Sequence, residues 1–131
     1  MEAIQRRATK LITHLKDKPY KVRMKELGLP SLVYRRKRGD MIQMFKIMNG
    51  LVRIDTNKLF TPIKISHNTR GHSQRIFKKH AVKLARSNTF SQRVVNDWNS
   101  LPDDVIGAPS IITFKNKLDK FWQNIHYDII D

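Results

Sequence analysis

Apolar side chains recur at helical spacing through the first part of the chain. Residues 2–15 are expected to form an amphipathic helix that buries one face. That face would consist of Ile4, Ala8, Leu11, Ile12 and Leu15. A proline at position 19 cannot continue this helix, and a shorter helix is expected at 20–27, with Gly28 suited to end it in a left-handed conformation. Its inward residues are expected to be Val22 and either Met24 or Leu27.

The strongest helical pattern runs from residue 31 to residue 49. Ser31 is a good N-cap, and Asn49-Gly50 is a good stop. The stripe expected to face the core consists of Tyr34, Arg38, Met41, Phe45 and Met48, with Met44 and Ile47 beside it. A further turn of helix is expected at 55–60, with Asp55 as its N-cap.

The helical period disappears between Thr61 and Arg86. Short apolar runs at 62–65, 74–77 and 82–84 are separated by polar segments. This pattern is typical of a hairpin or an irregular β segment.

Helical spacing returns in the last third of the chain. A helix at 89–100 would bury Phe90, Val94, Trp98 and Leu101. Another helical turn is expected after Pro102, where two aspartates would meet the positive end of the helix dipole. A last helix, capped by Ser110 and ending near 124, would bury Ile111, Phe114, Leu118, Phe121, Trp122 and Ile125.

Together these elements predict a mainly α fold. We expect a small multi-helix domain with one short β-hairpin or irregular β element around residues 62–86. It would be a single basic domain over 1–131, helical at 1–60, irregular or β at 61–87, helical at 88–125 and followed by a tail at 126–131. The large aromatics on the helical stripes are expected to pack in the core rather than to stack on nucleic-acid bases.

Positive charge dominates the composition and is concentrated in the first hundred residues. The 131-residue chain has 26 Lys and Arg against 11 Asp and Glu, which gives a formal charge of +15. Residues 1–50 carry +9, residues 51–100 carry +8 and residues 101–131 carry −2. Such asymmetry is typical of proteins that bind a polyanion, above all nucleic acid.

Other classes of function have little support. The longest apolar run, Leu32-Val33-Tyr34, is too short for a membrane span or a secretory signal, and the absence of cysteine excludes disulfides and thiolate metal sites. The histidines at 67, 72 and 80 match no common zinc spacing, and they are expected to be exposed or to contact phosphate. The acidic pair at 103–104 is explained by a helix start, so no catalytic residue, metal, cofactor, membrane or small-molecule substrate is expected.

Three basic clusters are the candidates for contact with nucleic acid. They lie on the first helix, on the first turns of the 31–49 helix and at 69–79, where Gly71 would let backbone amides approach an anion. The candidate contact residues are Arg6, Arg7, Lys10, Arg35, Arg36, Lys37, Arg70, Gly71, His72, Arg75, Lys78, Lys79 and Arg93. The alternative is a solvated face with structural ion pairs, such as Arg36 with Asp40.

Several motifs in a fixed order give a family resemblance. They are Ile-Gln-Arg-Arg-Ala-Thr-Lys-Leu-Ile at 4–12, Leu-Gly-Leu-Pro-Ser-Leu at 27–32, Tyr-Arg-Arg at 34–36 with Arg-Gly-Asp-Met at 38–41, Met-Asn-Gly-Leu at 48–51, Thr-Arg-Gly-His-Ser at 69–73, Phe-Ser-Gln-Arg-Val-Val-Asn-Asp-Trp-Asn-Ser-Leu-Pro at 90–102, and Ala-Pro-Ser at 108–110 with Phe-Lys-Asn at 114–116. Over residues 3–123 the chain resembles the C-terminal, thumb-end and post-thumb region of non-LTR (LINE, Jockey-like) retrotransposon reverse transcriptases.

The resemblance implies the non-catalytic end of an RNA-directed DNA polymerase. In that family the Tyr-Ala-Asp-Asp motif and an endonuclease lie upstream of this region, and this sequence contains neither, so no enzymatic activity is expected of it. It would be a fragment or a truncated, domesticated copy. The Gln5-Arg6-Arg7 helix is similar to the end of the thumb, which holds the template–primer duplex.

The expected partners are RNA, DNA or their hybrid, together with the upstream polymerase domains, in the nucleus or a cytoplasmic ribonucleoprotein. Two alternatives remain open: a protein-interaction module that docks on a polymerase body, and a domesticated, sequence-specific DNA-binding helical domain. The 31–49 helix would be the recognition helix of the latter.

Overall fold

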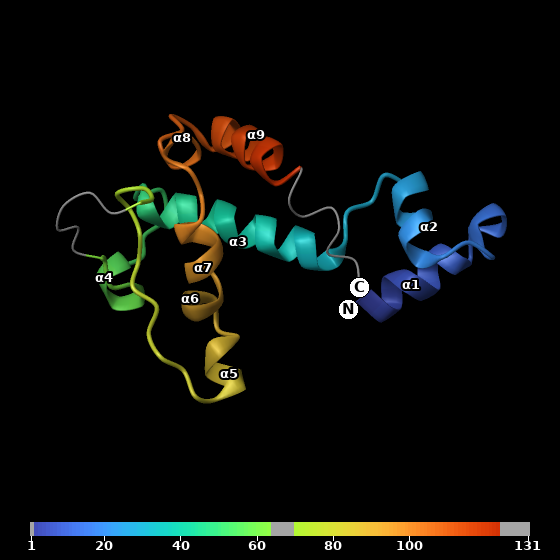
Figure 1. The fold of residues 1–131 in the computed structure, drawn as a ribbon, viewed down its shortest axis with the longest axis horizontal. Coiled ribbons are helices and arrows are strands. Elements are labelled where there is room, and N and C mark those ends of the chain that lie inside the picture. The colour runs from blue at the N-terminus through green and yellow to red at the C-terminus, as the bar shows by residue number, and fades with distance from the viewer. Residues whose placement is uncertain (1, 64–69, 124–131) are drawn as a thin grey trace. The chain divides into compact units, whose positions relative to one another are not determined.

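The computed structural model describes residues 2–63 and 70–123, which are mainly helical (Figure 1). The helices are α1 (Glu2–Lys10), α2 (Tyr20–Glu26), α3 (Leu32–Met48), α4 (Thr56–Leu59), α5 (Leu84–Ser87), α6 (Phe90–Arg93), α7 (Val95–Asn99), α8 (Asp103–Ile106) and α9 (Ile111–Trp122), with a 3₁₀ turn at Thr13–Leu15. The predicted mainly α class is confirmed. Among the described helices, none has the length and apolar character needed to cross a membrane.

The chain groups into two compact units. Among the described residues, unit 1 consists of 2–36 with 121–123, and unit 2 consists of 37–63 and 70–120. The first half of unit 1 differs from the sequence prediction, because the helix expected at 2–15 ends at Lys10 and its apolar stripe faces solvent. Ile4 is 74% exposed and Leu11 is 85% exposed. Of the five predicted inward residues only Leu15 is fully buried.

A polar contact sets the orientation of α1. Its buried residue is Thr9, whose Oγ1 accepts a hydrogen bond of 3.1 Å from Nε of Arg23, a buried residue of α2. A buried guanidinium without hydrogen-bond partners would cost several kilocalories per mole, so α1 turns its polar side toward α2. In α2, Met24 is buried as predicted, but Val22 is exposed.

The predicted ends of α2 and α3 are confirmed. Gly28 adopts φ +62°, and the amide of Leu29 donates to the carbonyl of Met24, as in a Schellman stop. Ser31 caps α3, because its Oγ accepts from the amide of Tyr34 at 3.0 Å. Gly50 ends α3 with φ +69°.

The core of unit 2 forms where α3, α7 and α9 meet. Phe45 of α3 stacks on Phe114 of α9 with ring centroids 4.4 Å apart, and Trp98 of α7 lies 6.5 Å from the same ring. These side chains and Leu118 are buried, as predicted from their helical spacing. Figure 1 shows α9 running beside α3. Ser110 caps α9 by accepting from the amide of Thr113 at 3.2 Å, also as predicted.

The segment between α4 and α5 holds the irregular β element. Its described part contains one antiparallel bridge, Pro62 with Ile76, flanked by a hydrogen bond from Phe77 N–H to the Thr61 carbonyl. The run at 82–84 is not a strand, because Val82 is exposed and Leu84 begins α5. Residues 64–69 lie outside the described residues. The helix expected at 89–100 is instead divided at residue 94 into α6 and α7.

We expect Trp98→Ala to destabilise the chain by about 3–5 kcal/mol, the cost typical of a buried aromatic. Trp98 is fully buried, and its Nε1–H donates to the Gln74 carbonyl at 2.9 Å. Chemical denaturation measures the effect. Leu84→Ala, at a site that is 76% exposed, is the control and should cost less than about 0.5 kcal/mol. Equal stability of the two variants would contradict this description of the core.

Candidate nucleic-acid interface

Unit 1 contains a basic pocket between α1, α2 and the segment that joins them. We call it the N-terminal basin; its cavity is about 490 Å³. The described lining residues are Arg6, Arg7, Lys10, Lys16, Asp17, Lys18, Pro19, Tyr20 and Arg23. Six of them are cations and one is a carboxylate, so the basin presents a positive potential to solvent.

Arg23 lies at the base of this basin and carries a buried positive charge. Besides the bond to Thr9, its Nη1 donates to the Lys18 carbonyl at 2.6 Å and its Nη2 to the Arg6 carbonyl at 3.2 Å. All three acceptors are neutral oxygens, so they satisfy N–H groups of the Arg23 guanidinium without offsetting its positive charge. Because only 3% of Arg23 is exposed, this charge is poorly screened by solvent and strengthens the field in the basin.

Tyr20 forms an aromatic wall of the basin. The Arg6 guanidinium lies 4.7 Å from the centre of the Tyr20 ring. The Tyr20 hydroxyl donates a hydrogen bond to the Glu2 carboxylate at 2.6 Å. Burial and the bond to Glu2 raise the pKa of Tyr20 to about 12. The hydroxyl therefore remains a donor at neutral pH.

Glu2 joins the start of α1 to the start of α3. Its Oε1 accepts from the amides of Leu32 at 2.8 Å and Val33 at 3.3 Å. Burial alone would raise the pKa of Glu2, but the hydrogen bonds from Tyr20 and these amides, with the nearby Arg6 charge, together lower it below its ordinary value. The first amides of a helix have no acceptor within the helix, and the Glu2 carboxylate supplies one for the amides of Leu32 and Val33.

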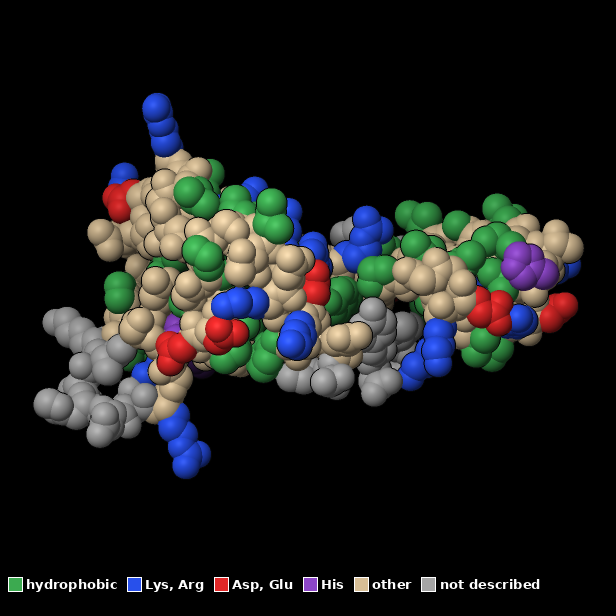
Figure 2. All heavy atoms as spheres, turned by 90° about the horizontal axis from the view of Figure 1, so that it is seen from above, with side chains coloured by type: hydrophobic (Ala, Val, Ile, Leu, Met, Phe, Trp, Pro, Cys, Tyr) green, Lys and Arg blue, Asp and Glu red, His purple; other side chains and the backbone are tan. Residues whose placement is uncertain are grey.

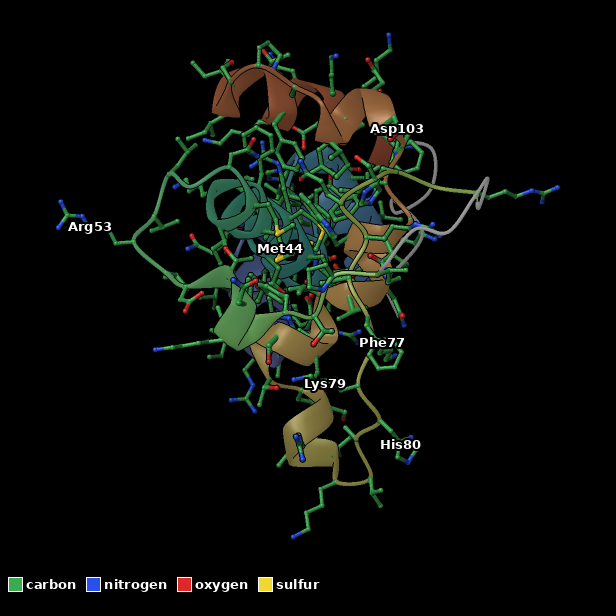
Figure 3. All side chains as sticks on the ribbon, turned by 90° about the vertical axis from the view of Figure 1, so that its left-hand side faces the viewer. Met44, Arg53, Phe77, Lys79, His80 and Asp103 are labelled. Atoms are coloured by element: carbon green, nitrogen blue, oxygen red, sulfur yellow. The ribbon has the colours of Figure 1, made fainter. Side chains whose placement is uncertain are left out.

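A second basic pocket lies in unit 2, and we call it the Phe77 pocket. Its cavity is about 570 Å³. The described lining residues are Phe77, Lys78, Lys79, His80, Ala81, Ser87, Gln92, Arg93 and Asn96. In Figure 3, the labelled Phe77, Lys79 and His80 lie on the segment that leads to α5.

The first and third predicted clusters contribute to these two pockets. Arg6, Arg7 and Lys10 line the N-terminal basin, whereas Lys78 and Lys79 line the Phe77 pocket. The side chains of Arg7 and Lys10 make no hydrogen bond or ion pair with other described residues.

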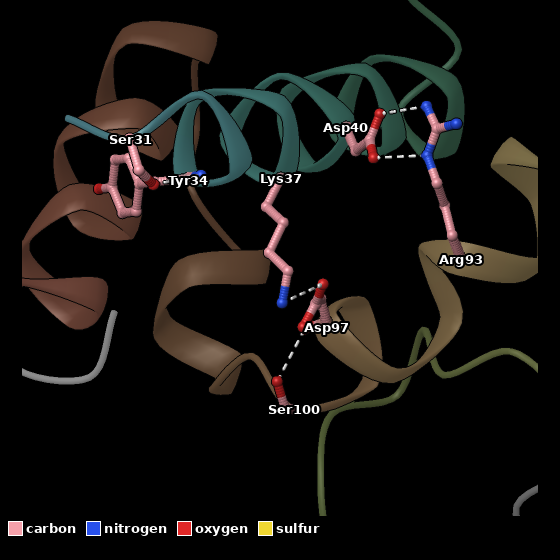
Figure 4. Close-up of polar contacts among 7 residues, drawn as sticks. All are labelled: Ser31, Tyr34, Lys37, Asp40, Arg93, Asp97 and Ser100. Atoms are coloured by element: carbon pink, nitrogen blue, oxygen red, sulfur yellow. Dashed lines mark hydrogen bonds and ion pairs between the residues drawn. The ribbon is translucent and has the colours of Figure 1, made fainter. Parts of the chain in front are cut away.

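The second predicted cluster is divided by its contacts. Arg35 and Arg36 are exposed on α3. Lys37, by contrast, lies 3.7 Å from the carboxylate of Asp97, a contact that joins α3 to α7 (Figure 4). Lys37 is therefore partly neutralised within the fold.

The loop expected to bind an anion at 69–73 is built differently. Arg70 is exposed, and Gly71 has φ +110°, so any other residue would be strained there. A Cβ at this position would lie 2.9 Å from Cδ of Arg75. The expectation that His72 is exposed or contacts phosphate is wrong: it is fully buried. Thr69 lies outside the described residues.

His72 is buried because both of its ring nitrogens are satisfied by the backbone. Nε2 lies 2.8 Å from the Trp98 carbonyl, and Nδ1 accepts from the amide of Gln74 at 3.2 Å. These contacts assign the neutral tautomer with the proton on Nε2. The imidazole also packs edge-on against Trp98, with centroids 5.7 Å apart, so it organises the core of unit 2.

Arg93 is held in a structural ion pair. Its Nε and Nη2 donate to the two carboxylate oxygens of Asp40 at 2.8 and 2.9 Å, which raises the pKa of Arg93 (Figure 4). The partner suggested for Asp40 from sequence, Arg36, is therefore wrong. A similar two-bond pair joins Arg38 to Asp119 at 2.6 and 2.9 Å.

Sequence patterns missed several residues that shape the pockets. Arg23, Tyr20 and Lys16 of the basin and Gln92 of the Phe77 pocket were not among the predicted contacts. Local spacing carries no signal for them, because tertiary contacts bring them to the pockets. In Figure 2 the visible Lys and Arg side chains occupy separate places on the surface, some beside acidic side chains.

A scan against protein-family models, a search of curated proteins and a search of solved structures each found no match. Function is therefore inferred from the residues of the chain itself.

We expect Glu2→Gln to lower the free energy of unfolding by about 1–2 kcal/mol at pH 7, because the amide replaces a charged acceptor. Since the pKa of Glu2 is lowered from 4.5 in the folded chain, its contribution is complete above that pH. The stability difference between the wild type and Glu2→Gln disappears as the pH falls through the folded-state pKa of Glu2, because residue 2 is then uncharged in both proteins. Denaturation at a series of pH values measures the difference.

Glu26→Gln is the control for this experiment. Glu26 pairs with Lys18 at the surface, and such a pair contributes less than about 1 kcal/mol. A difference between wild type and Glu2→Gln that stays constant down to acid pH would contradict the assigned role.

Proposed function

We propose that this chain is a non-catalytic nucleic-acid-binding segment that holds phosphates of a template or primer. In keeping with its resemblance to the C-terminal region of non-LTR retrotransposon reverse transcriptases, it would serve an RNA-directed DNA polymerase. The N-terminal basin is the observation that carries the proposal. Nucleic acid is the polyanion whose regular phosphates suit such a cluster of cations.

The charge of the basin supports phosphate as its ligand. Arg7, Lys10 and Lys16 line the cavity, and the buried Arg23 adds a charge that no described carboxylate contacts. A phosphate there would gain Coulomb energy and displace counterions. Such contacts position a nucleic acid without reading its sequence.

The same proposal includes the expectation that this chain has no polymerase or nuclease activity. Hydrolysis or transfer of phosphodiesters by two metals requires carboxylates that share the cations. Among the described residues, no three His, Asp or Glu side chains gather in a way that could hold a metal ion. We expect the purified chain to extend no primer and cleave no nucleic acid; such an activity, lost on a point change within residues 1–131, would contradict the proposal.

A second candidate function is a protein-docking module. It is favoured by the outward apolar stripe of α1, where Ile4 and Leu11 are mostly exposed. Exposed apolar side chains at i, i+4 and i+7 can pack against a partner protein. This function predicts weak nucleic-acid binding with little dependence on salt.

We expect the affinity for nucleic acid to fall steeply with salt. If five to seven phosphates are contacted, log K should fall against log salt with a slope of about −4 to −6. Arg7→Gln with Lys10→Gln should reduce the slope by about one to two and weaken binding to all sequences alike. Fluorescence anisotropy over a salt series measures both quantities. A flat salt dependence would contradict the proposal.

The control variant removes the same charge from α9. The variant Lys115→Gln with Lys120→Gln changes residues outside both pockets and outside the three predicted basic clusters, so it should leave the slope within its error. The surface pair Arg35→Gln with Arg36→Gln tests the second predicted cluster. We expect it to reduce the slope by about one to two with an almost unchanged melting temperature.

A further inference from the structure

An exposed aromatic side chain lines the second basic pocket. Phe77 is 57% exposed, although phenylalanine ordinarily lies in the core. It lines the pocket with Lys78, Lys79 and His80, which are also exposed. An aromatic face next to cations is the combination by which proteins hold unpaired bases and the phosphates beside them.

The backbone that carries Phe77 is fixed in place. Its amide donates to the Thr61 carbonyl at 2.7 Å. The preceding residue, Ile76, is buried and is held by the Asn99 side chain, which accepts from its amide at 2.9 Å and donates to its carbonyl at 2.8 Å. The backbone of Phe77 is therefore already fixed, so little backbone entropy is lost when a ligand packs on the exposed ring.

A buried polar side chain in the same pocket has an unused hydrogen-bonding atom. Gln92 lines the pocket and is 9% exposed. None of the described residues donates to its Oε1, and a buried acceptor in that state costs about 1–3 kcal/mol. A ligand that offers an N–H group there would remove this cost once the side chain turns toward it.

The pocket is positive even though Arg93, the one arginine in its described lining, is neutralised. Arg93 is paired with Asp40, so its guanidinium is engaged on the side of α3. The side chains of Lys78 and Lys79 make no hydrogen bond or ion pair with other described residues, so both can contact phosphate. An apolar ligand alone would leave these charges without a partner.

We propose that the Phe77 pocket binds one unpaired nucleotide of a single-stranded nucleic acid. The base stacks on the Phe77 ring, Lys78 and Lys79 contact the adjoining phosphates, and the Gln92 amide accepts a hydrogen bond from the edge of the base. This inference rests on the proposed function and adds a preference for single strands to it. A base inside a duplex has both faces covered by its neighbours and cannot stack on Phe77.

The first test uses the unmodified chain and two labelled oligonucleotides of about 12 nucleotides, within the range of single-strand site sizes. One is oligo(dA), and the other has the same backbone with every base replaced by an abasic site. We expect oligo(dA) to bind about tenfold more tightly, the effect of one base stacked on an aromatic side chain. Equal affinities would overturn the proposal that the Phe77 pocket binds a base, but would leave the proposal of phosphate binding intact. If neither strand binds, the proposed function fails as well.

Two variants then assign the preference to the pocket. Phe77→Leu keeps the apolar contact but removes the aromatic face, so its affinity for oligo(dA) should fall about tenfold, close to that for the abasic strand. Phe77→Tyr retains the ring and should restore the difference. Gln92→Met should reduce oligo(dA) binding without a comparable loss for the abasic strand.

The control is Val82→Ala, at an 87% exposed apolar position outside the pocket lining. It should bind both strands like the unmodified chain. Melting temperatures verify that each variant is folded. A preference for oligo(dA) that survives in folded Phe77→Leu would overturn the assignment to this pocket.

Discussion

Repulsion among 26 cations, with only 11 carboxylates to offset it, is the constraint under which this chain folds. Several of the described carboxylates lie where helices must be joined or capped. Glu2 connects α1, Tyr20 and the first amides of α3. The remaining ion-pair junctions are Asp40 with Arg93, Asp97 with Lys37, Asp119 with Arg38, Asp104 with Lys117 and Glu26 with Lys18. Each of these six carboxylates thus fixes a contact and lowers local repulsion.

Some of the cations outside these junctions line two pockets with different chemistry, whereas others, such as Arg35 and Arg36, are exposed on helix surfaces. In the N-terminal basin, neutral oxygens hold Arg23 in position while its charge remains uncancelled. In the Phe77 pocket, the Asn99 side chain holds the backbone of Ile76 by two hydrogen bonds. The next residues, Phe77, Lys78 and Lys79, are exposed. A polyanion would relieve the repulsion in both. If nucleic acid is the ligand, as proposed, its binding would also stabilise the folded chain.

Local chemistry predicted most element ends but few of the contacts that build the candidate sites. Ser31, Gly28 and Gly50 act within one helical turn, and their roles follow from the residue type alone. The outward stripe of α1 could not be predicted, because a polar contact with Arg23 on another helix overrides the apolar pattern. The prediction for His72 was wrong for a similar reason: the Trp98 carbonyl, 26 positions away in the sequence, lies beside it only in the folded chain.

The position of bound nucleic acid on the chain is the most direct test of this account. Amide chemical shifts can be followed by NMR while a short single strand is added at low salt, and followed again as salt is raised. The account predicts shifts concentrated in the lining of the N-terminal basin and of the Phe77 pocket, reversed by salt. Shifts confined to α8 and the exposed face of α9, or no shifts at all, would contradict it.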